Sequence, residues 1–191
     1  MSLTVSRETR YRVDSHKILT VLDPPVLTLA QCKNVLHVNH DEDDVFIEKI
    51  MGGVERQIER YIKRDIVKKR RKAYWFSHQG VALLPYGPHG QIISVDVTDV
   101  NDIIHEITDY KLKGLEWKRL EGINTRGSLE VVYDSGYEVA ERPPEAEGAM
   151  LQEVSLQYKN RQDPDSAGFT SYKNLSIEAR HLLDGLIRRA I

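Results

Sequence analysis

One continuous apolar stripe between residues 47 and 62 constrains the fold of this chain more than any other feature. The stripe follows helical spacing and runs for roughly four turns. Acidic residues 41–44 precede it, where negative charge favours a helix N-terminus. Gly52 and Gly53 interrupt it against helix propensity, at about 1 kcal/mol each, and close approach of a neighbouring backbone is one explanation. The members of the stripe are Ile47, Ile50, Met51, Val54, Ile58, Tyr61 and Ile62.

The hydrophobic period changes to two after residue 66. Apolar and polar side chains alternate in residues 93–98, 110–113 and 128–133, and Gly114 and Gly122 stand where hairpin turns are needed. This pattern predicts an α+β fold that is mostly helical, with a small antiparallel β-sheet inserted between N-terminal and C-terminal helices. The sheet is expected at about residues 66–134, and the helices at about 28–37, 43–63, 143–160 and 176–189.

Length and composition are typical of one globular domain. The chain has 191 residues, 40% of them hydrophobic, and a formal net charge of -2, which excludes a disordered chain. Residues 1–25 are polar and end in Asp23-Pro24-Pro25, which predicts an N-terminal arm followed by a single domain at 26–191. The sequence has no apolar run long enough for a membrane span and no signal-peptide pattern, so we expect a soluble intracellular protein with no membrane partner.

The small net charge conceals three charged blocks. Residues 63–72 carry a local charge of +6, residues 41–44 a local charge of -4 and residues 128–165 a local charge of -6. Because the blocks are far apart in the sequence, we expect separate positive and negative poles. Such poles would suit a protein that contacts a different partner on each side.

The basic block is densest at five consecutive residues, Lys68, Lys69, Arg70, Arg71 and Lys72. This cluster could contact nucleic-acid phosphates through counterion release. It could also bind an acidic partner protein, or protect the edge of a solvated strand. A nucleic-acid-binding module that uses residues 63–72 is therefore one hypothesis for the function.

The sequence contains no recognisable catalytic, metal-binding or cofactor-binding motif, and we do not expect an enzyme. Phosphate-binding loops, dinucleotide-binding loops and nucleophile elbows are absent from it. His37 and His40, followed by the acidic residues 41–44, could bind a divalent ion, but solvated residues of a loop and a helix cap explain them better. Cys32 lies on the apolar face of the first predicted helix, where a buried, inert thiol is expected.

Six short motifs follow one another in a recognisable order. Together they resemble the head–tail connector, or adaptor, proteins of long-tailed bacteriophages and prophages, over about residues 25–190. Residues 1–24 and 68–72 are not part of that pattern. The motifs are Val26-Leu27-Thr28-Leu29 at a helix start, the acidic stretch His40 to Asp44 before the long helix, Leu83-Leu84-Pro85-Tyr86-Gly87-Pro88 before a strand, the strand end Val131 to Tyr137, the signature Tyr158-Lys159-Asn160-Arg161, and the leucine-rich end from Leu182 to Ile187.

This resemblance implies a structural role without catalysis or cofactors. Proteins of this family form a ring of about a dozen subunits under the portal after DNA packaging. The ring extends the DNA channel and offers a docking platform, although the free subunit could be monomeric. The implied partners are copies of the chain itself, the portal protein, a tail-side connector or tail protein, and DNA that passes through the lumen without sequence specificity. The implied location is the head–tail junction of the virion, and the host bacterial cytoplasm during assembly.

Six residues near the C-terminus are candidates for contact with a neighbouring subunit or the portal: Tyr158, Asn160, Arg161, Leu183, Leu186 and Ile187. The last three form the apolar stripe of the final predicted helix, which is a natural docking element. Alternatively, this stripe packs on its own domain, and the two interpretations are compatible. A closed ring also needs two different faces on each subunit that meet head to tail, and separate charge poles would supply them.

Overall fold

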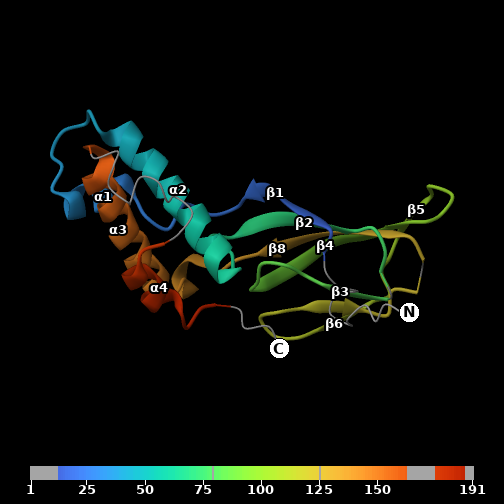
Figure 1. Cartoon of the computed structure of the whole chain (residues 1–191). Coiled ribbons are helices and arrows are strands. Elements are labelled where there is room, and N and C mark those ends of the chain that lie inside the picture. Colours follow the sequence, from blue (N-terminus) through green and yellow to red (C-terminus); the bar gives the residue numbers. More distant parts are fainter. Residues whose placement is uncertain (1–12, 79, 125, 163–174, 188–191) are drawn as a thin grey trace, which may run out of the picture. The chain divides into compact units, whose positions relative to one another are not determined.

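The computed structural model describes residues 13–78, 80–124, 126–162 and 175–187, in a chain that divides into two compact units (Figure 1). The first comprises Met1–Asp23 and Val67–Glu138, and we call it the sheet unit. The second comprises Pro24–Ile66 and Val139–Ile191, and we call it the helical unit. The sequence predicted a boundary between residues 25 and 26, and the structure has a boundary between the two units nearby, between Asp23 and Pro24. The sheet unit, however, contains residues from before and after this boundary.

The sheet unit contains two antiparallel sheets. The larger has the strand order β1-β2-β8-β4-β5 and the smaller the order β3-β7-β6. Alternate residues of the long strands face a core that includes the buried side chains of Trp75, Val95, Val131 and Tyr133. The strands span Ser15–Val21 (β1), Lys69–Trp75 (β2), Val81–Leu83 (β3), His89–Thr98 (β4), Ile104–Glu106 (β5), Lys111–Lys113 (β6), Arg119–Glu121 (β7) and Ser128–Ser135 (β8).

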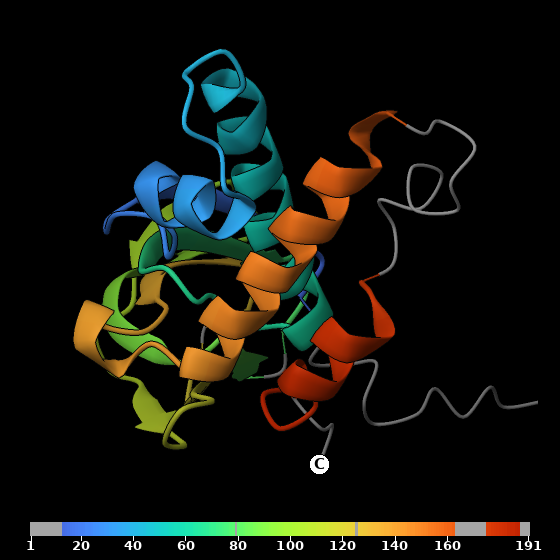
Figure 2. The ribbon, with the colours of Figure 1, turned by 90° about the vertical axis from the view of Figure 1, so that its left-hand side faces the viewer.

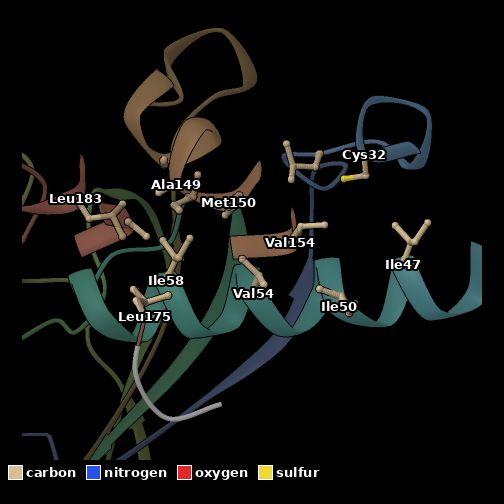
Figure 3. Close-up of a cluster of buried hydrophobic side chains, with 14 of the residues drawn as sticks. Cys32, Ile47, Ile50, Val54, Ile58, Ala149, Met150, Val154, Leu175 and Leu183 are labelled. Atoms are coloured by element: carbon tan, nitrogen blue, oxygen red, sulfur yellow. The ribbon is translucent and has the colours of Figure 1, made fainter. Parts of the chain in front are cut away.

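The helical unit has its own core. Figure 2 shows α2, α3 and α4 packed side by side. The apolar stripe predicted for residues 47–62 faces this core, where Ile47, Val54 and Ile58 are fully buried (Figure 3). The helices span Leu29–Leu36 (α1), Asp44–Ile62 (α2), Pro144–Lys159 (α3) and Ile177–Leu183 (α4), with short 3-10 helices at Val139–Glu141 (η2) and Asn160–Gln162 (η3).

Local sequence signals set the ends of these helices. The Gln31 N–H donates to the Thr28 hydroxyl while the Thr28 N–H donates to Gln31 Oε1, a reciprocal cap that starts α1. His37, with φ of 56°, ends α1, and Lys63, with φ of 58°, ends α2. Pro144 stands in the first turn of α3, where its missing N–H is not needed.

The predicted α+β class is confirmed, but the chain is less helical than expected. Eight strands are present among the described residues, in two sheets rather than one small sheet. Strand β1 comes from residues that we expected in a polar arm, and it pairs with β2. Helix α4 ends at Leu183, ahead of the expected end near residue 189. None of the described helices is long and apolar enough to cross a membrane.

Candidate interaction sites

The basic run at residues 68–72 is divided between two faces of the sheet unit by the alternation of β2. Lys69 and Arg71 are buried, with 2% and 4% of their surface exposed. The Arg71 guanidinium lies 4.0 Å from the centre of the Tyr86 ring, a cation–π contact. Lys68 and Lys72 remain partly exposed. The run is therefore not a continuous exposed basic surface.

Three carboxylates pair with the partly exposed bases, and we call these pairs the β2–β8 charge ladder. Arg70 donates from Nε and Nη2 to the two carboxylate oxygens of Asp134, at 2.8 and 3.2 Å, a bidentate geometry. This bond raises the pKa of Arg70, and the bond to Glu138 raises the pKa of Lys68. The pairs are Lys68 with Glu138, Arg70 with Asp134 and Lys72 with Glu130.

The strand register explains the ladder. In the antiparallel pairing of β2 with β8, Arg70 lies opposite Asp134, 64 positions away in the sequence. Tyr74 lies opposite Glu130, so Lys72 reaches Glu130 across the diagonal. The expectation of separate poles therefore fails for these three pairs, in which an acid of the block at 128–165 neutralises a base of the block at 63–72.

The acidic block at residues 41–44 is also largely paired. Lys33 Nζ lies 2.6 Å from a carboxylate oxygen of Asp41 and 2.7 Å from one of Asp44, and these bonds raise the pKa of Lys33. His40 Nε2 lies 3.8 Å from Asp43. Within the part of the chain that the structure describes, no group of three histidine, cysteine or acidic side chains could hold a metal ion.

The signature residues Tyr158 and Arg161 hold the start of α2. The Tyr158 hydroxyl and the Arg161 guanidinium both donate to Asp43 Oδ2, the latter at 2.8 Å. Arg161 also lies 4.0 Å from the centre of the Tyr158 ring. The bond from Tyr158 is the largest cause that lowers the pKa of Asp43. Asn160 caps the end of α3, so all three residues have structural roles in their own unit, and a docking role for them stays a prediction.

The C-terminal apolar stripe packs against the core of the helical unit. Leu183 is fully buried, and Leu186 and Ile187 are partly buried against the same cluster. Residues 188 and 189 of the predicted helix lie outside the described residues. The stripe therefore packs on its own domain, which is one of the two interpretations given in the sequence analysis. The other interpretation, contact with a neighbouring subunit or the portal, stays a prediction.

Cys32 is a buried thiol in the core of the helical unit (Figure 3). Burial raises the pKa of this thiol to about 11. The thiol is therefore protonated at neutral pH, and because only the thiolate is a good nucleophile, Cys32 acts as a small apolar side chain.

A hollow beside α2 is the feature that sequence reasoning missed. It has a volume of about 600 Å³, and we call it the α2 groove. Two of the basic residues that border the groove have a glutamate, Glu48 or Glu55, as sequence neighbour, so no run of positive charge marks them in the sequence. Helical spacing brings the basic residues of α2 to one side of the helix. The basic side chains that border the groove are Lys49, Arg56, Arg60 and Arg180.

Comparison with known proteins gives one family and several structures. Residues 26–114 match the family described as "Phage gp6-like head-tail connector protein". No curated protein matches the chain. One similar structure is a chain of the "Neck of empty GTA particle computed with C6 symmetry", with a TM-score of 0.72 and 12% identity over 93% of this chain and 97% of that chain.

Two further structures have the same fold. A chain of the "Virion of native gene transfer agent (GTA) particle" has a TM-score of 0.72 and 13% identity, over 92% of this chain and 96% of that chain. A chain of the "Neck of native GTA particle computed with C12 symmetry" has a TM-score of 0.69 and 13% identity, over 93% and 97%. At this low identity, the three structures establish the fold of the chain.

The fold is thus one that also occurs in neck and virion chains of gene transfer agent particles. The family match concerns residues 26–114, just under half of the chain, which are similar to gp6-like head–tail connectors. The resemblance to phage head–tail connector proteins that the sequence predicted is confirmed.

Proposed function

We propose that this chain is a structural, non-catalytic subunit of the head–tail junction of a phage or phage-like particle. Copies of the chain form a ring under the portal, extend the DNA channel and provide a platform for tail-side proteins. The observation that carries this proposal is the family match over residues 26–114. The similar chains from neck structures computed with C6 and C12 symmetry support a ring, since cyclic symmetry relates identical subunits.

The alternative of a nucleic-acid-binding module has less support. Phosphate binding needs cations that can replace counterions, whereas three bases of this run, Lys68, Arg70 and Lys72, already pair with carboxylates in the β2–β8 charge ladder. We therefore expect DNA to pass through the proposed ring without specific contacts from residues 68–72.

Electron microscopy tests this function directly. The chain is co-expressed with the portal protein of the same phage or phage-like particle, and the complex is purified and imaged. We expect a ring of this chain on one end of the portal. A chain that never joins the portal, its particles or a ring of its own copies would overturn the proposal, whereas monomers in isolation would not, because the portal can be required for assembly.

The docking role of the C-terminal stripe has a separate test. Leu186→Ser with Ile187→Ser removes the partly buried apolar side chains beside α4. If these side chains dock, this variant keeps its circular dichroism spectrum and loses co-purification with the portal. Val100→Ser, which changes a side chain that is 88% exposed in the sheet unit, is the matched control and should bind normally. Loss of folding in the double variant would assign the stripe to its own core instead.

A further inference from the structure

The α2 groove combines an apolar floor with a basic border. Phe46, Ile50, Tyr61 and Leu175 supply apolar side chains to its wall. Lys49, Arg56, Arg60 and Arg180 supply four positive charges, and no carboxylate is among the described residues that line it. A concave site with an apolar wall and a few convergent polar groups is the usual form of a binding site.

The bases of this border are available, unlike those of the charge ladder. Lys49, Arg56 and Arg60 are exposed, and none of them has a hydrogen bond or ion pair with another described residue. Arg180 uses one nitrogen, because its Nε donates to the Ser176 carbonyl at 3.4 Å, and its other nitrogens make no hydrogen bond or ion pair with a described residue. The groove therefore concentrates uncompensated positive charge at an apolar hollow.

Gly53 keeps the groove open. It follows Lys49 by one turn and precedes Arg56 and Arg60 on the same side of α2. A Cβ at Gly53 or Gly52 would meet no atom of the described residues within 4 Å, so close approach of a neighbouring backbone, one explanation offered above, does not account for either glycine. A glycine inside a helix costs about 1 kcal/mol of stability relative to alanine, and no packing contact in the described structure requires a glycine at position 53. Space for the side chain of a binding partner would explain it.

We propose that the α2 groove binds an acidic, amphipathic segment of a partner protein. Carboxylates of that segment pair with the basic border, and its apolar side chains enter beside Gly53 and contact the floor. A helix with one acidic and one apolar face satisfies both requirements. The inference goes beyond the proposed ring, because copies of this chain can form a ring without such a segment.

Two other occupants fit the groove less well. DNA would use the cations but would leave the apolar wall at Phe46 and Tyr61 without a function, because phosphate contacts are polar. A second copy of this chain would need a free acidic segment. Its most acidic described segment, residues 41–44, already pairs with Lys33 and Arg161.

Fluorescence anisotropy with labelled probes tests the proposal. The main probe is a synthetic peptide of about four helical turns, with glutamates on one face and leucine and phenylalanine on the other. A second peptide has the same glutamates with serine in place of the apolar residues, and a third probe is a short DNA duplex. The protein is the full chain, with each variant checked by circular dichroism.

Charge and shape variants each have a matched control. Lys49→Glu, Arg56→Glu and Arg60→Glu together reverse the border, while Lys17→Glu, Lys111→Glu and Arg126→Glu change the net charge equally at exposed positions of the sheet unit. Gly53→Phe places an aromatic ring in the α2 groove. Gly52→Phe places one in a separate hollow of about 300 Å³ that Glu48 and Glu55 border, and Gly53→Ala leaves the α2 groove open.

We expect the amphipathic acidic peptide to bind the wild-type chain in a saturable way and more tightly than the serine peptide. The border reversal and Gly53→Phe should each weaken this binding by at least about tenfold. The matched charge control, Gly52→Phe and Gly53→Ala should bind as the wild type does.

Several results would overturn the proposal. They are the absence of saturable binding by the amphipathic peptide, equal binding to Gly53→Phe, and equal or tighter binding of the serine peptide or the DNA duplex. If the wild-type chain self-associates and the border reversal abolishes this self-association, the groove binds a second copy of the chain instead. Asp163 and Asp165 lie outside the described residues. Peptide binding that appears only after both are changed to Asn would assign the groove to an acidic segment of the chain itself.

Discussion

At the scale of the residue, Gly52 and Gly53 are the clearest departure from local propensity. Because a Cβ at either position would meet nothing within 4 Å, Gly52→Ala and Gly53→Ala should each raise the free energy of unfolding by up to about 1 kcal/mol. Gly136→Ala is the contrasting control, since Gly136 has φ of 109° and its Cβ would lie 2.5 Å from the Val67 carbonyl oxygen. Urea titrations measure both effects, and destabilisation by Gly53→Ala would contradict the open space seen beside α2.

Asp43 couples stability to pH through its bonds to Tyr158 and Arg161. These bonds lower the pKa of Asp43 in the folded chain, so their stabilisation is present above the unfolded pKa of about 3.9 and is lost as the pH falls through the folded value. Asp43→Asn should therefore reduce stability at neutral pH and flatten the pH dependence below about pH 4.

Thermal unfolding between neutral and acidic pH checks this prediction. Glu42→Gln is the matched control, because it removes the adjacent exposed carboxylate, which has no partner among the described residues. A pH profile that Glu42→Gln flattens as much as Asp43→Asn does would show that the signature residues do not stabilise the carboxylate of Asp43.

At the scale of the element, the pairing of β2 with β8 gives three bases of the run at residues 68–72 a structural role. Lys68→Ser, Arg70→Ser and Lys72→Ser together should destabilise the sheet unit, because Asp134 is buried and would lose its bidentate partner. The same variant should leave DNA affinity unchanged, since these bases are already neutralised.

Denaturant titration and DNA anisotropy at several salt concentrations measure the two outcomes. Lys49→Ser with Arg56→Ser and Arg60→Ser is the matched variant, since it removes the same number of bases from the α2 groove. If the ladder variant instead lost a steeply salt-dependent affinity for DNA, the nucleic-acid hypothesis for residues 63–72 would regain support.

The same elements show what the sequence can and cannot predict. The stripe that becomes the buried face of α2 is readable because helical spacing needs no distant partner. Strand β1 was missed because all seven of its residues are exposed, so that no apolar alternation marks it. The ladder was missed because strand register decides which charges meet, and register depends on the whole sheet. The α2 groove was missed because its bases alternate with acids along the chain.

At the scale of the whole molecule, the two cores share no residue. Ile58→Ala opens a cavity in the helical unit and Leu129→Ala opens one in the sheet unit, since both side chains are fully buried. Each should lower stability by about 2–5 kcal/mol, and hydrogen exchange should accelerate chiefly in the unit that carries the change. Equal acceleration in both units for both variants would show that the chain unfolds as one cooperative body.

The β2–β8 charge ladder has a practical consequence for purification. A sequence scan would class residues 68–72 as a heparin-binding motif and suggest an affinity column. Because carboxylates already pair with Lys68, Arg70 and Lys72, this segment offers a sulfated resin few exchangeable counterions. Any retention of the wild-type chain on such a resin should instead fall when Lys49, Arg56 and Arg60 are replaced, which makes a column elution profile a quick assay of the exposed bases on α2.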